Sequence, residues 1–272
     1  MKRLFFIKLC GVLLFVSSSV SSCRTEGKVI EEEIEVFVSE HHRIIGETMA
    51  AQIANMPEAF PLLDREVYAD AYNYLDRLLS TLLFTSVVNH RKDFNWSVTI
   101  LHDDSIQNSF TFPGGHIYVY TGLLKFLSAE HELMAVLGNE IAYADKEFSA
   151  IAMRDTYGGV FMGDIVLGKD MPELPSVVTS FPEMEFNEDF VISADQYAID
   201  LICPFQYDVD GLQNFLVKAK ANNIEWLKAK QLKELEFATR IEILEVTTGD
   251  CGEGGVTNLE AYQRKIKNFL PR

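Results

Sequence analysis

Hydrophobic residues recur every three or four positions along several stretches of the chain, which places them on one face of a helix. The clearest stretch runs from Leu63 to about Asn89. Ser128 can cap a second long helix that reaches about Phe148, with acidic residues in its first turn. Four further stretches predict helices: residues 37–55, 188–203, 210–221 and 225–246.

A different pattern separates the first two of these long helices. Residues 96–101 alternate and are rich in β-branched side chains, and residues 109–112 and 116–120 flank a Pro-Gly-Gly turn. Alternation of this kind is typical of short strands with one covered face. The chain is therefore expected to have an α+β fold that is mostly helical, with a small antiparallel sheet.

Composition narrows the possible partners. The chain has 272 residues, of which 48% are hydrophobic, and a formal net charge of −16 at pH 7. This hydrophobic fraction is enough for one domain with its own core. The acidic charge disfavours nucleic acid as a partner, because phosphate backbones would be repelled.

The N-terminus has the layout of an export signal. Lys2 and Arg3 precede the apolar run Leu9–Val16, and small residues lead to Cys23. This end resembles the lipobox of bacterial lipoproteins, which implies a lipid on Cys23 and a membrane anchor. The alternative is an ordinary cleaved signal with an incidental cysteine. Arg24 after the cysteine favours an outer-membrane location in the cell envelope, facing the periplasm or the cell surface.

These features divide the chain into four parts. Residues 1–22 are the expected lipoprotein signal peptide, and residues 23–60 are a tether with an N-terminal helix. Residues 61–246 form the main domain, and residues 247–272 form a C-terminal tail. Cys203 and Cys251 remain after export, and an oxidising compartment permits a disulfide between them.

The middle of the chain carries the main chemical signal. Residues 108–149 read NSFTFPGGHIYVYTGLLKFLSAEHELMAVLGNEIAYADKEFS. They resemble the zinc metallopeptidases of family M48, which includes CAAX prenyl, HtpX-type and BepA-type proteases. The resemblance implies a zincin-like (gluzincin) fold over about residues 60–245. It also implies that Glu140 holds the position of the general base, and that Asp195 holds the position of a supporting aspartate.

The departures from the family pattern fall on the zinc ligands. Asn139 and Tyr143 stand where the family has two histidines, and Val191 stands where it has a glutamate. An amide oxygen is a poor zinc ligand, a phenol must first lose a proton of pKa about 10, and valine offers no donor atom. No cofactor is therefore expected. Without zinc, Glu140 has no acidified water to act on.

The strand after the Pro-Gly-Gly turn suggests a second use of the fold. In the family an edge strand at this place receives the substrate as an extended chain, which implies a peptide-binding edge at Gly115, His116, Ile117 and Tyr118. Strand addition needs main-chain groups rather than a metal. The side chain of His116 is expected to face solvent rather than to act as a ligand.

Three functions follow as hypotheses. The first is an inactive pseudo-peptidase that binds an extended peptide or an envelope protein. The second is an active metalloendopeptidase with an atypical metal site around Glu140, Asp195 and Tyr143. The third is a structural envelope component without a peptide groove, which a strand edge covered by residues 157–182 would favour.

Overall fold

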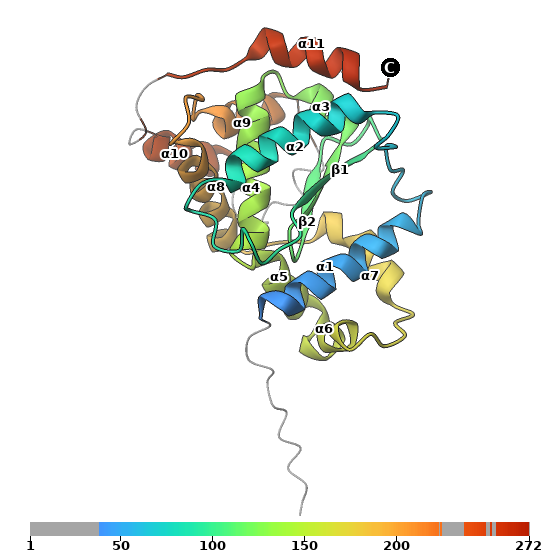
Figure 1. Ribbon diagram of the computed structural model, residues 1–272. Coiled ribbons are helices and arrows are strands. Elements are labelled where there is room, and N and C mark those ends of the chain that lie inside the picture. Colours follow the sequence, from blue (N-terminus) through green and yellow to red (C-terminus); the bar gives the residue numbers. More distant parts are fainter. Residues whose placement is uncertain (1–37, 223, 225–236, 249–250, 252–253, 272) are drawn as a thin grey trace, which may run out of the picture. The chain divides into compact units, whose positions relative to one another are not determined.

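The computed structural model describes residues 38–222, 224, 237–248, 251 and 254–271 (Figure 1). All of these residues belong to one compact unit, Ile34–Arg272. The expected signal peptide and its lipidation site at Cys23 lie outside the described residues. Within the described ranges, no helix is long and apolar enough to cross a membrane.

The fold is α+β, as the sequence predicts. Its helices are α1 (Ser39–Ala54), α2 (Ala69–Leu83), α3 (Thr121–Phe126), α4 (Glu130–Asp145), α5 (Phe148–Tyr157), α6 (Gly159–Val166), α7 (Leu174–Ser180), α8 (Glu188–Ile202), α9 (Gly211–Ala221), α10 (Phe237–Thr248) and α11 (Leu259–Phe269). A short 3-10 turn, η1, spans Phe181–Glu183. The glycine- and proline-containing region after α5 therefore holds two helices of its own, which the sequence pattern did not predict.

The sheet has three strands in the order β1-β3-β2: β1 (Ser97–Leu101), β2 (Ser109–Phe112) and β3 (His116–Tyr120). The tight turn before β3 makes β2 and β3 antiparallel, as expected. However, β1 pairs with β3 in parallel, from Ser97 opposite His116 to Leu101 opposite Tyr120. The sheet is therefore mixed rather than purely antiparallel, because the connection after β1 carries the chain past the place that β3 later fills.

This strand order corrects the expected peptide-binding edge. β3 is the central strand, so its residues from His116 to Tyr118 pair with β1 on one side and with β2 on the other. The carbonyl of Gly115 also accepts a hydrogen bond from the amide of Ser97. Main-chain groups that are already paired cannot receive an added strand. The prediction of an edge at Gly115, His116, Ile117 and Tyr118 is therefore wrong.

Helix α4 is the centre of the fold. All sixteen of its residues are buried, including its acidic ones. It packs against α8, α9 and α5 and lies against β2, with α2 on a further side (Figure 1). Gly138 permits the close approach of α8, because a Cβ atom there would lie 3.2 Å from the Cα of Ala198. The helix that carries the metallopeptidase-like motif is thus a core element.

Candidate functional site

Two packed helices bring the predicted site residues together. Asn139, Glu140 and Tyr143 lie on α4, while Val191 and Asp195 lie one turn apart on α8. The amide nitrogen of Asn139 donates to Asp195 Oδ1 at 2.8 Å. Val191, one turn before Asp195, is buried and offers only hydrocarbon. The structure therefore groups all three changed ligand positions with the two retained acidic residues.

Glu140 is held by the sheet. Only 1% of the residue is exposed. Ser109 donates its hydroxyl to Oε1 at 2.6 Å, and Thr111 donates to Oε2 at 2.8 Å. Both hydroxyls point the same way because alternate residues of a strand share a face. Each oxygen of the carboxylate is thus bound within the fold.

Asp195 is neutralised by an arginine from the C-terminal part of the fold. Arg240 on α10 donates from Nε to Oδ2 at 2.8 Å and from Nη2 to Oδ1 at 2.7 Å. The side chains of Arg240 and Asp195 are 7% and 2% exposed. Burial lowers the pKa of Arg240, but the charge and hydrogen bonds of Asp195 raise it more. The pKa of Arg240 is therefore raised overall. This fork-to-carboxylate geometry makes a buried ion pair between the two side chains.

Tyr143 is packed as an aromatic core residue. Its ring centre lies 4.5 Å from that of Phe186 and 6.3 Å from that of Phe148. Burial raises the pKa of the Tyr143 phenol well above its usual value; the charge of Arg240 opposes this rise, and nearby carboxylates add to it. A phenol in this environment keeps its proton at neutral pH and cannot serve as a phenolate ligand.

The donor set does not fit the zinc that the M48 resemblance implies. Zinc needs nitrogen, thiolate or carboxylate donors in a tetrahedron with one open position. At the three ligand positions the chain offers an amide, a protonated phenol and an alkyl group. The nearest carboxylates already accept hydrogen bonds: Glu140 accepts from two hydroxyls of β2, and Asp195 accepts from Arg240. In the described part of the chain, no three His, Cys, Asp or Glu side chains cluster so that they could hold a metal ion.

His116 lies under a helix rather than in solvent. Its Nδ1 is 3.2 Å from the hydroxyl of Ser97, its pairing partner on β1. Gly46 of α1 contacts the imidazole so closely that a Cβ atom there would lie 2.9 Å from Cδ2. Burial lowers the pKa of His116. The expectation of a solvent-facing side chain is wrong, because α1 covers this end of the sheet.

The outer side of β2 is also covered. The carbonyl of Thr111 accepts from the hydroxyl of Ser149 on α5 at 2.7 Å. Asn108 donates its side-chain amide to the carbonyl of Pro182 at 3.2 Å. The ring of Phe181 packs edge-on against Phe112, with ring centres 4.7 Å apart. Ser149 of α5 therefore occupies one main-chain acceptor of β2, and η1 packs against side chains of this strand and of Asn108 just before it.

Three partners of the site could not be named from motifs. Ser109 and Thr111 carried a weak signal, since two hydroxyls at alternate positions of an expected strand share one face. Arg240 carried almost none, because it is one of several basic residues in the expected last helix. Its role depends on how α10 packs against α8, which sequence spacing does not show.

Cys203 and Cys251 are joined by a disulfide, with their Cα atoms 5.4 Å apart. Cys203 caps the C-terminus of α8. Close by, Tyr207 and Val256 form an isolated parallel bridge. The disulfide thus fastens the segment before α11 to the helix that carries Val191 and Asp195.

Comparison with known proteins agrees with this fold. Residues 70–168, which include all three strands and α4, match the model of Peptidase family M48. Over residues 70–168 the chain is therefore similar to peptidase family M48.

Several metallopeptidases are similar to it. Mitochondrial metalloendopeptidase OMA1 of Arabidopsis thaliana is 25% identical over 124 residues, which cover 45% of this chain and 25% of that protein. Metalloendopeptidase OMA1 of Bos taurus is 33% identical over 78 residues, which cover 27% of this chain and 15% of that protein. The beta-barrel assembly-enhancing protease of Yersinia pestis is 26% identical over 133 residues, which cover 44% of this chain and 27% of that protein. The match therefore spans about a quarter or less of the length of these relatives.

Proposed function

We propose that this protein is a non-proteolytic M48 domain of the bacterial cell envelope, held at the outer membrane by a lipid on Cys23. It acts by binding an extended peptide or another envelope protein. The observation that carries the proposal is the state of Glu140, whose two carboxylate oxygens accept hydroxyls from β2 in the buried core. The similarity to the beta-barrel assembly-enhancing protease of Yersinia pestis supports the envelope location.

The chemistry of metal-assisted hydrolysis explains the inactivity. A zinc peptidase needs an open coordination position for water and a glutamate that can reach that water. Here Asn139 donates toward Asp195, and Arg240 occupies the remaining acceptor sites of the same carboxylate. The polar groups of the former metal position thus satisfy one another. The site is a closed hydrogen-bonded contact between α4, α8 and α10.

A second candidate function is a structural envelope component without a peptide groove. The covered outer side of β2 favours it, since Ser149 and η1 already contact that strand. Peptide binding by strand addition would require residues 181–183 to move away from β2. The two functions therefore differ in one property, which is whether η1 can open.

The inactive state is tested with an unfolded, fluorescently labelled protein as the substrate. The wild type and Glu140→Gln should both fail to cleave it, with or without a metal chelator. Cleavage that both a chelator and Glu140→Gln abolish would establish the alternative, an active metalloendopeptidase with an atypical site.

Peptide binding is tested by loosening η1. Phe181→Ala removes a ring that packs on Phe112 and Phe110, so it should make the outer side of β2 more accessible. If the protein binds extended peptides, the variant should bind a peptide library more tightly than the wild type. If neither form binds any peptide, the structural function is favoured and the binding function is rejected.

A further inference from the structure

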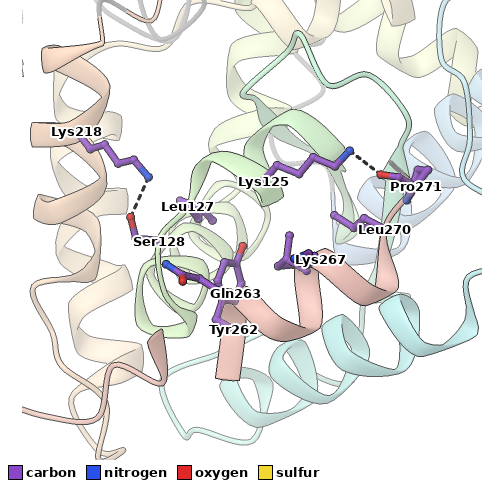
Figure 2. Close-up of a pocket in the computed structure, with 10 residues that line it drawn as sticks. Lys125, Leu127, Ser128, Lys218, Tyr262, Gln263, Lys267, Leu270 and Pro271 are labelled. Atoms are coloured by element: carbon purple, nitrogen blue, oxygen red, sulfur yellow. Dashed lines mark hydrogen bonds between the residues drawn. The ribbon is translucent and has the colours of Figure 1, made fainter. Parts of the chain in front are cut away.

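A cavity of about 430 Å³ lies between α3, α9 and α11, and Ser128 also lines it (Figure 2). Ten residues line it: Lys125, Leu127, Ser128, Lys218, Tyr262, Gln263, Ile266, Lys267, Leu270 and Pro271. None of the residues of the metallopeptidase-like motif is among them. Its volume falls in the range of small-molecule sites, about 300–1,000 Å³.

The charge of this cavity is opposite to that of the chain. The lining contains three lysines and no acidic residue, although the whole chain has a formal charge of −16. Figure 2 shows Lys218 extending from α9 toward Ser128, Lys125 extending from α3 toward Pro271, and Lys267 on α11. A local concentration of positive charge on an acidic protein attracts anions to one place.

Two of the three ammonium groups lack a carboxylate partner among the described residues. Lys218 donates to the carbonyl of Phe126 and to the hydroxyl of Ser128, the latter at 2.8 Å. Lys267 has no hydrogen bond or ion pair within the described ranges. Lys125 differs, because it donates to Asp104 at 2.7 Å. The cavity therefore holds about two positive charges that the described protein leaves uncompensated.

The remaining walls are apolar. Leu127, Ile266 and Leu270 are buried, and their side chains line the cavity. The ring of Tyr262 is also buried, and its hydroxyl donates a hydrogen bond to the carbonyl of Leu124 at 2.6 Å. The cavity thus presents hydrocarbon and an aromatic ring beside the lysines. A ligand that fits must carry both an anionic group and an apolar group.

We propose that this cavity binds a phosphate monoester with an apolar substituent. Ammonium groups act as compact point charges that suit a tetrahedral phosphate, whereas planar carboxylates are matched better by the arginine fork. A phosphate monoester has a second pKa of about 6 and so carries close to two negative charges at neutral pH. Two lysines without a carboxylate partner balance such a dianion better than they balance a monocarboxylate.

The test is calorimetric titration of the full chain with three probes: inorganic phosphate, phenyl phosphate and benzoate. Phenyl phosphate should bind at least about tenfold more tightly than either of the others, because only it uses the lysines and the apolar wall together. No binding of phenyl phosphate would overturn the proposal. Equal affinity for phenyl phosphate and inorganic phosphate, or for phenyl phosphate and benzoate, would also overturn it.

Variants locate the binding in the cavity. Lys267→Gln should weaken the binding of phenyl phosphate by about tenfold, as expected for loss of one charge-assisted contact. Gln263→Trp should abolish binding by filling the space while leaving every lysine in place. Lys220→Gln is the matched control, since Lys220 is exposed on α9 and does not line the cavity. Thermal unfolding confirms that each variant folds. Unchanged affinity in both Lys267→Gln and Gln263→Trp would overturn the proposal.

A further pair of measurements separates two sources of the ligand. Phosphatidylcholine vesicles with and without phosphatidate are compared for binding of the same chain. Extra binding to the phosphatidate vesicles that Lys267→Gln removes would identify a membrane phospholipid as the source. Binding of phenyl phosphate without that difference would identify a soluble phosphate monoester.

Discussion

The two ends of α4 each bury a glutamate, and the fold stabilises the two in different ways. Glu130 in the first turn accepts hydrogen bonds from groups far apart in the sequence: Tyr74, Tyr207 and Asn258, with Arg77 and Lys265 as cationic neighbours. Glu140, near the other end, accepts from Ser109 and Thr111 on a single strand. One carboxylate ties distant segments together, and the other fixes a local contact between helix and sheet.

The difference shows why burial alone does not identify a catalytic residue. Glu130 belongs to no motif, yet it connects α2, the segment after α8, and α11 to the core. Glu140 stands where the M48 resemblance implies a general base, yet its oxygens accept hydrogen bonds from β2. A general base needs an acceptor that can reach a reacting water, whereas both oxygens of Glu140 already accept hydroxyls from β2.

The largest effect is expected at the Glu140 end, from the buried ion pair. Arg240→Leu leaves Asp195 charged and buried, so it should lower the free energy of unfolding by about 3–5 kcal/mol, measured by urea denaturation. Arg154→Ala is the control, because the Arg154–Asp155 pair is exposed and should contribute less than about 1 kcal/mol. A loss for Arg240→Leu as small as that of the control would mean that Asp195 is not dependent on Arg240.

The disulfide should support the Glu130 end. It closes a loop with a sequence separation of 48. In the chain-entropy model a loop of that length contributes about 4 kcal/mol. The double variant Cys203→Ser, Cys251→Ser should therefore unfold at a lower denaturant concentration. Hydrogen exchange should show α11 losing protection before α4 does. Unchanged protection of α11 would show that the contacts around Glu130 do not depend on the disulfide.

Acid should weaken the Glu130 end specifically. Burial raises the pKa of Glu130, but hydrogen bonds from Tyr207, Tyr74 and Asn258, together with the charge of Lys265, lower it to about 2. The folded-state pKa is below the unfolded one, so the stabilisation is complete above about pH 4.5 and is lost as pH falls toward 2. The shift corresponds to about 3 kcal/mol.

Glu130→Gln tests this directly. The stability gap between the wild type and Glu130→Gln should shrink by about 3 kcal/mol as the pH falls from about 5 to about 2, measured by urea unfolding at each pH. A gap that does not change with pH would show that Glu130 is not the group whose protonation weakens the fold.

The smallest effect is expected from Glu140→Gln. Glutamine keeps one acceptor oxygen, and the hydroxyl of Ser109 or Thr111 can rotate to accept from its amide. The free energy of unfolding should fall by about 1 kcal/mol, as for the loss of one ordinary hydrogen bond. Glu140→Leu is the comparison, since it leaves both hydroxyls without that acceptor and should cost more. Equal losses in the two variants would show that the hydroxyl contacts do not hold Glu140.

The sequence predicted the parts of the fold that depend on local spacing. Periodicity located α2, α8 and α9, and the motif placed Asn139, Glu140 and Tyr143 beside Val191 and Asp195. What it missed depends on long-range pairing. Alternation of apolar residues does not show the direction of a neighbouring strand, so the parallel pairing of β1 with β3 was missed. The edge position of β3 was expected from the family resemblance, and the strand order places β3 in the centre.

The partners of the site were missed for a related reason. Arg240 reaches Asp195 across 45 positions of sequence, and Pro182 reaches Asn108 across 74. Such contacts depend on how helices pack, not on residue type or spacing. The sequence did carry one signal, the departure from the M48 pattern at Asn139, Tyr143 and Val191, which stands out because the residues around these positions keep that pattern.

Zinc content tests the central claim most directly. The zinc content of the purified wild-type chain and of the triple variant with Asn139→His, Tyr143→His and Val191→Glu is measured by elemental analysis. Circular dichroism shows that both proteins are folded. We expect no zinc in the wild type and one zinc per chain in the triple variant. One zinc per chain in the wild type would contradict it.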